Sequence, residues 1–163
     1  MTVAGRRLVP ITPLPTRADA VWDALLEAVP DVSTRPEALD AYTPALRQLH
    51  AMSLLTAEVN NGGFSQFFFN GGGMWVDDAI AGWAAAGLPA HEELTRQATD
   101  AVVAGMDGLV AAQRGKTLEA YAAWASESDL GRFDDRWWEL ADHEPNLDRF
   151  VAEHLDEIWA EPA

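Results

Sequence analysis

The chain has 163 residues, a formal net charge of −15 and no cysteine. Without cysteine it can form neither disulfides, thiolate zinc sites nor a thiol nucleophile, which fits a reducing compartment, so we expect a cytoplasmic protein. The acidic balance disfavours direct binding to nucleic acid or an anionic membrane, because both need a basic surface, and it favours a basic partner.

The first fifteen residues are predicted to form an extended arm. Their apolar run is short and is interrupted by Pro10, Pro13 and Pro15, which is typical of neither a signal peptide nor a membrane span. From residue 16 onward apolar residues recur at helical spacing, and no stretch shows convincing strand alternation. We find no internal repeat or domain linker. The sequence therefore predicts an all-α fold, in which 16–163 form a single-domain multi-helix bundle after an extended N-terminal arm at 1–15.

Prolines, glycines and capping residues place the helix boundaries. The predicted helices cover 17–29, 34–42, 44–60, 64–69, 75–86, 90–114, 118–125, 132–142 and 146–160. The segment 90–114 carries one apolar stripe that includes small residues, so a neighbouring helix could approach it closely. We expect it to be the central helix.

The most distinctive segment joins the predicted helices 44–60 and 64–69, and from 58 to 73 it reads EVNNGGFSQFFFNGGG. Its asparagines and glycines are residues that a helix end and a tight turn require, and its phenylalanines are spaced to face the core. Its polar side chains can satisfy loose backbone amides. We therefore interpret it as structural. The signature residues are Glu58, Asn60, Asn61, Gly62, Gly63, Phe64, Gln66, Phe67, Phe68 and Asn70.

An alternative interpretation is a small-ligand-binding or enzymatic site around Glu58, Asn60, Asn61 and Gln66. A carboxylate near aromatic rings can have a raised pKa and act as an acid or a base. Other chemistry is not indicated: the glycines lack the Lys-Ser/Thr end of a phosphate loop, the histidines lack metal-binding spacing, and no serine lies in a nucleophile elbow. We predict a non-enzymatic protein with no catalytic residue, metal or cofactor.

The last part of the chain holds much of the acidity, because 119–163 contains thirteen of the 26 acidic residues but three of the 11 basic ones. In the predicted helix 132–142 we expect Phe133, Trp137, Trp138 and Leu140 to face inward and the acids to project outward. Acids four residues apart on a helix face are separated by about 6 Å along its axis, a phosphate-like spacing. The predicted partner-binding residues are Asp134, Asp135, Glu139, Asp142, Glu144, Asp148, Glu153, Asp156 and Glu157.

Spacing alone does not separate a DNA-like surface from a solvated one, because acidic surfaces also serve solubility. Duplex DNA carries one charge per roughly 1.7 Å of its axis. One helix falls short of that density, so imitation would need two acidic helices or a homodimer.

The run from Glu58 to Asn70, followed by Ala79, Trp83, Gly87 and a helix that begins near Leu94, resembles a bacterial helical domain family. The resemblance covers about residues 45–160. This family is best known from a DNA-mimic protein, an acidic helical dimer that occupies DNA-binding proteins, including a helix-turn-helix transcription factor and a histone-like protein. The resemblance implies an all-α fold, a basic DNA-binding partner of either kind, no direct contact with nucleic acid or membrane, and the option of a homodimer.

We hypothesise that the chain is an acidic, non-enzymatic interaction protein that occupies the DNA-binding face of a transcription factor or nucleoid protein. An immunity or antitoxin protein that neutralises a basic toxin would use the same electrostatics. This alternative differs in the identity of the partner and stays open.

Overall fold

The computed structural model describes residues 15–29, 40 and 42–160. Over these residues the chain forms nine α-helices and one 3-10 helix without a strand, which confirms the expected all-α bundle. The predicted arm, apart from Pro15, and most of the predicted helix 34–42 lie outside the described residues. None of the described helices combines the length and the apolar character needed to cross a bilayer.

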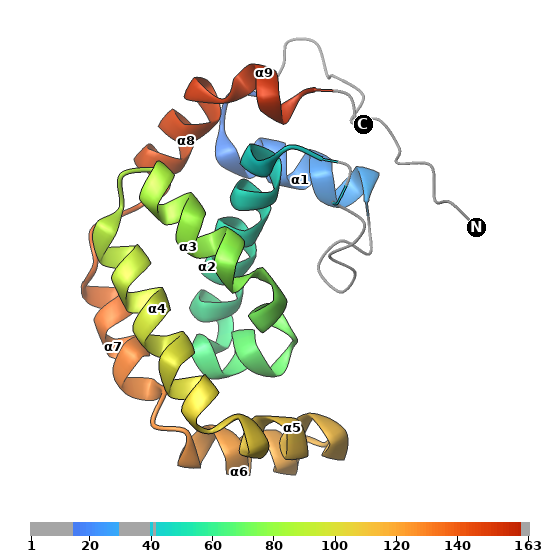
Figure 1. Ribbon diagram of the computed structural model, residues 1–163, viewed down its shortest axis with the longest axis vertical. Helices are drawn as coiled ribbons and strands as arrows, with labels where there is room; N and C mark the ends of the chain where they lie inside the picture. Colours follow the sequence, from blue (N-terminus) through green and yellow to red (C-terminus); the bar gives the residue numbers. More distant parts are fainter. Residues whose placement is uncertain (1–14, 30–39, 41, 161–163) are drawn as a thin grey trace.

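The helices are arranged around α2, which contacts α1, α3, α5, α7 and α9. Figure 1 shows α8 and α9 across one end of α2 and the α5–α6 pair at its other end, with α7 on the outer side of α4. The helices are α1 (Ala18–Ala28), α2 (Pro44–Phe69), η2 (Gly72–Trp75), α3 (Val76–Ala85), α4 (Pro89–Ala104), α5 (Met106–Gly115), α6 (Leu118–Glu127), α7 (Gly131–Glu139), α8 (Glu144–Glu153) and α9 (Leu155–Ile158).

The prediction of a central helix over 90–114 was wrong. Gly105 has φ −112° and ψ 22°, which ends α4 and lets α5 leave in a new direction to pack against α6. Glycine is a poor helix former, but hydrophobic periodicity continues across it and conceals the break. The predicted helix 146–160 is likewise divided at His154 into α8 and α9.

The signature segment kinks α2 at two glycines. Gly62 and Gly63 have non-helical backbone angles, so the predicted helices 44–60 and 64–69 lie on either side of one kink. Gly63 has φ 79° and ψ 178°, a combination that is almost restricted to glycine. A Cβ atom at this position would lie 2.3 Å from Oδ2 of Asp134. The backbone and its neighbour therefore both require glycine here.

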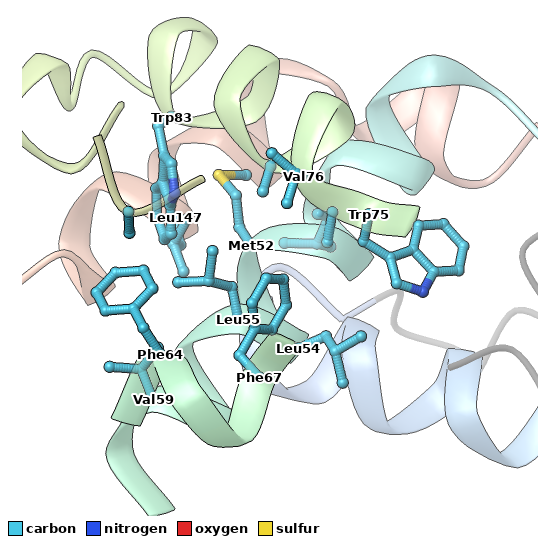
Figure 2. Packing of buried hydrophobic residues seen from close by; sticks show 14 of the residues in the cluster. Met52, Leu54, Leu55, Val59, Phe64, Phe67, Trp75, Val76, Trp83 and Leu147 are labelled. Atoms are coloured by element: carbon cyan, nitrogen blue, oxygen red, sulfur yellow. The ribbon is translucent and has the colours of Figure 1, made fainter. Parts of the chain in front are cut away.

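The kink brings the phenylalanines of the signature into the core. Phe64, Phe67 and Phe68 are buried, as their spacing predicts. Figure 2 shows Phe64 and Phe67 in the same apolar cluster as Leu55 and Met52, on the earlier part of α2, and Trp83 of α3. The two parts of α2 are thus joined by shared packing as well as by the chain.

Two histidines are buried in this core. The ring centroid of His91 lies 5.2 Å from each of the Trp83, Trp137 and His143 ring centroids. Burial lowers the pKa of His91 to about 4, and the nearby His143 adds to the effect. Burial also lowers the pKa of His50 to about 4. Both rings are therefore neutral at neutral pH.

We predict that replacing Gly63 with alanine (G63A) lowers the free energy of unfolding by about 1–3 kcal/mol, because alanine must adopt a backbone conformation that favours glycine. Chemical denaturation measures this change. The matched control is G131A at the start of α7, where a Cβ atom would meet nothing within 4 Å. That substitution should be neutral or stabilising by up to about 1 kcal/mol. Equal destabilisation by both substitutions would contradict the account of the kink.

We also predict that the free energy of unfolding falls as the pH is lowered from about 6.5 toward 4. The unfolded chain protonates His50 and His91 near their ordinary pKa of 6.5, whereas the folded chain does so at about 4. Their contribution is therefore complete above pH 6.5 and is lost as the pH falls through about 4. The H91F variant keeps an aromatic ring but removes one titrating group, so its unfolding free energy should fall less steeply over this window. Equal slopes for both proteins would refute this role of His91.

Candidate functional site

The carboxylate of Glu58 connects the two parts of α2 across the kink. Its Oε2 atom accepts hydrogen bonds from Nε2 of Gln66 at 2.8 Å and from Nδ2 of Asn70 at 2.9 Å. Gln66 follows the kink and Asn70 is the residue after the last turn of α2. The Glu58 carboxylate therefore accepts hydrogen bonds from two side-chain amides of the signature, and these bonds stabilise the kinked segment.

The other two amides of the alternative ligand site take no part in these bonds. Oδ1 of Asn60 accepts a hydrogen bond from Nε1 of Trp137 at 3.0 Å, which connects the signature to α7. Asn61 is exposed, and its side chain makes no hydrogen bond within the described part of the chain. The structure thus joins Glu58, Gln66 and Asn70 by hydrogen bonds in which neither Asn60 nor Asn61 takes part.

A hollow of about 650 Å³ opens beside this group, between the end of α2 and the turn that joins α5 to α6. Gln66, Asn70 and Lys116 line it with polar groups, and Phe69 and Tyr121 line it with rings. The last turn of α5 is joined to α2 by Gln113, whose Nε2 donates to the carbonyl oxygens of Phe68 and Phe69 at 3.2 and 3.0 Å. The hollow combines aromatic surface with amide groups.

Two of the nine predicted partner-binding acids support the fold instead of projecting outward. Oδ1 of Asp134 accepts a hydrogen bond from the backbone N–H of Phe64 at 2.7 Å, and Oδ1 of Asp148 accepts one from the N–H of Ala18 at 2.8 Å. Both donors belong to backbone groups at the start of helical turns, which lack intrahelical partners. Burial raises the pKa of Asp134, although the bond from Phe64 opposes this, and the charge of Asp135 adds to the rise.

The remaining seven acids are exposed, and we call them the acidic surface. They lie on α7, α8, α9 and the connection between α7 and α8; in Figure 1, α7 and α8 follow one another up the left edge of the molecule and α9 continues across its top. Within the described residues, the carboxylates of four of them (Asp135, Glu139, Glu144 and Asp156) accept no hydrogen bond and form no ion pair. The acidic surface consists of Asp135, Glu139, Asp142, Glu144, Glu153, Asp156 and Glu157.

The three arginines among these helices have other partners. Arg132 pairs with Asp129 at 3.2 Å, Nη1 of Arg136 donates to Oε1 of Gln97 at 2.6 Å, and Nη2 of Arg149 donates to the carbonyl oxygen of Ala86 at 3.0 Å. Of the acidic surface only Glu153 lies near one of them, with 3.9 Å between its Oε1 and Nε of Arg149. Most carboxylates of the acidic surface are therefore not paired with an arginine of these helices.

Trp138 was expected to face inward, but 63% of its surface is exposed. Neighbouring residues on a helix point about 100° apart, so only one of Trp137 and Trp138 can share the inward face with Phe133. Phe133 and Trp137 are spaced four residues apart and both are buried. That spacing is the signal in the sequence that could have placed Trp138 outside.

No group of three or more histidine, aspartate or glutamate side chains within the described parts of the chain is arranged to hold a metal ion.

A protein-family model described as DMP19-like protein matches residues 40–154, which is more than half of the chain and overlaps most of the segment 45–160. No curated protein and no solved structure matches the chain at a significant level.

The role of Asp134 leads to a prediction about a pair of substitutions. D134A leaves the Phe64 N–H without an acceptor in a buried position and should lower the free energy of unfolding by about 1–3 kcal/mol. D134N keeps an oxygen acceptor and removes a charge that burial disfavours, so it should cost less than D134A. Urea denaturation of both variants measures the difference.

The matched control for these variants is D135A, because Asp135 is exposed and has no described partner. An exposed substitution of this kind changes stability by about 0.5 kcal/mol or less. If D134A were no more destabilising than D135A, the hydrogen bond to Phe64 would have no structural importance.

Proposed function

Because the chain belongs to the DMP19-like family, a family of DNA-mimic proteins, we propose that it is an acidic, non-enzymatic interaction protein that occupies the DNA-binding face of a basic protein. The partner is a transcription factor or a nucleoid protein of the cytoplasm. The observation that supports this proposal is the acidic surface: seven exposed carboxylates on three consecutive helices, beside arginines that have other partners.

The electrostatics of such a surface suit a partner that normally binds phosphates. A group of exposed like charges attracts a basic protein from a distance and raises its rate of association, and salt screens this attraction. The same surface repels DNA and anionic membranes. A homodimer could join two acidic surfaces and approach the charge density of a duplex.

The acidic surface is also held rigidly. Asp134 fastens α7 to the kink of α2, Trp137 adds a second bond to Asn60, and Asp148 fastens α8 to the start of α1. Surfaces that are ordered before binding lose less conformational entropy when a partner arrives. The same hydrogen bonds, on the inner sides of α7 and α8, also hold these helices in place against the mutual repulsion of their exposed carboxylates.

A small-ligand site is a second candidate, and the hollow beside Gln66 and Asn70 is the observation that favours it. Its volume lies in the range of about 300–1,000 Å³ that is usual for ligand pockets. An immunity or antitoxin protein would use the acidic surface itself against a different basic partner. Binding of a small ligand in the hollow should therefore not change when charges on α7–α9 are removed, whereas binding of a basic toxin should weaken.

The proposal predicts that neutralising the acidic surface weakens competition with DNA. The immobilised protein captures candidate partners from cells of its source, and each identified DNA-binding protein is then purified and bound to labelled DNA. Native protein should release the DNA. The variant D135N/E139Q/E144Q/D156N, which changes only the carboxylates without described partners, should need about a tenfold higher concentration, since several weak charge contacts of a few tenths of a kcal/mol each are lost.

The matched control is D77N/D107N/E119Q/E127Q, which removes the same number of exposed charges from α3, α5 and α6. It should release DNA nearly as well as native protein. Equal losses in both variants would show that net charge alone is responsible. A partner that keeps its DNA in an excess of native protein would refute the proposal.

A further inference from the structure

Trp138 differs from the other tryptophans of the chain. Of the seven tryptophans, all of which lie in the described residues, it alone is exposed; the others are buried or packed against the core. An indole ring has a large apolar area, and its burial stabilises the folded state. An exposed indole ring does not contribute this stabilisation. Tryptophan is also among the residues most enriched where proteins bind one another.

The outward position of Trp138 is imposed by the inner face of α7. Phe133 and Trp137 are buried on that face, where Trp137 donates to Asn60 and Asp134 accepts from Phe64. Turning Trp138 inward would break these contacts. The ring is therefore presented at the surface by a helix whose rotation is constrained.

The surroundings of the ring are negative. Asp135 lies three residues before Trp138 on the same side of the helix, and Glu139 follows Trp138 directly, about 100° further around the helix. Neither has a partner within the described residues, whereas the arginines of α7 are engaged by Asp129 and Gln97. Arg132 also lies over Phe133, with its Cζ 4.7 Å from the ring centroid. No cation of the described chain covers the Trp138 ring.

We propose that Trp138 is the anchor of the partner-binding surface and that it receives an arginine side chain of the basic partner, whose guanidinium group pairs with Asp135. This inference rests on the proposed function and specifies its site. A guanidinium group stacks flat on an indole face while its edge forms paired hydrogen bonds with a carboxylate, and the ammonium group of lysine cannot do both. The surface therefore distinguishes arginine from lysine, which charge alone would not.

The test uses fluorescently labelled nona-arginine and nona-lysine peptides as probes and measures their affinity by anisotropy at physiological salt. We expect nona-arginine to bind more tightly. W138A should weaken its binding about two- to fivefold, the range of an exposed cation–π contact. W138F should retain part of the affinity, and W138L, which is apolar but lacks a ring, should behave like W138A. The control is L118A, because Leu118 of α6 is 76% exposed, and it should bind like native protein.

A second measurement reports on the ring itself. With 5-fluorotryptophan incorporated at every tryptophan, the fluorine resonance that disappears in W138F belongs to Trp138. Nona-arginine should shift that resonance more than those of the buried rings, and nona-lysine should shift it less. An unshifted Trp138 resonance under saturating nona-arginine would overturn the proposal.

The two levels of the argument can fail separately. If D135N/E139Q/E144Q/D156N weakens nona-arginine binding but W138A does not, the acidic surface stands and the anchor is refuted. If W138A weakens binding and the charge variant does not, the acidic surface is refuted as the binding site, and the pairing of arginine with Asp135 is refuted with it. Equal losses in W138A and L118A would refute the anchor as well.

Discussion

The hydrogen bond between the N–H of Phe64 and the carboxylate of Asp134 is the interaction on which the arrangement of the molecule depends. A kink in a buried helix leaves backbone donors without partners, and an unpaired donor away from water is costly. Gly63 makes the kink sterically feasible, and Asp134 supplies the acceptor that it lacks. Because that acceptor comes from α7, the same bond that completes α2 also positions the first acidic helix.

The signature segment and the acidic surface are therefore two parts of one structure. Asp134, Trp137 and Asn60 join them at α7, while Asp148 joins α8 to α1 in a similar way. In both places a carboxylate on the inner side of an acidic helix accepts a bond from a helix start elsewhere in the fold. The acidic helices thus use some of their carboxylates for attachment and leave the others to solvent.

Local patterns were sufficient to predict much of this fold. The spacing of Phe64, Phe67 and Phe68 predicted three buried rings, and the glycines before them predicted the interruption of α2, because both depend on neighbours within a few residues. The pairing of Asp134 with Phe64 and of Asp148 with Ala18 could not be predicted, since each joins residues far apart in the chain. The break at Gly105 was missed because periodicity passes through a single glycine, and Trp138 was misplaced because an apolar residue was assumed to be buried. The site was therefore predictable as a region of charge, but not as a division between supporting and exposed side chains.

The two faces of α7 have a consequence for how such proteins can diverge. The inner face, with Phe133, Asp134 and Trp137, is buried against or bonded to the scaffold, whereas Asp135, Trp138 and Glu139 on the outer side are exposed. Substitutions on the outer side can accumulate without loss of the fold. Relatives that share the kinked helix can thus acquire different partners. A shared scaffold therefore indicates a shared fold, but it does not by itself identify the bound partner.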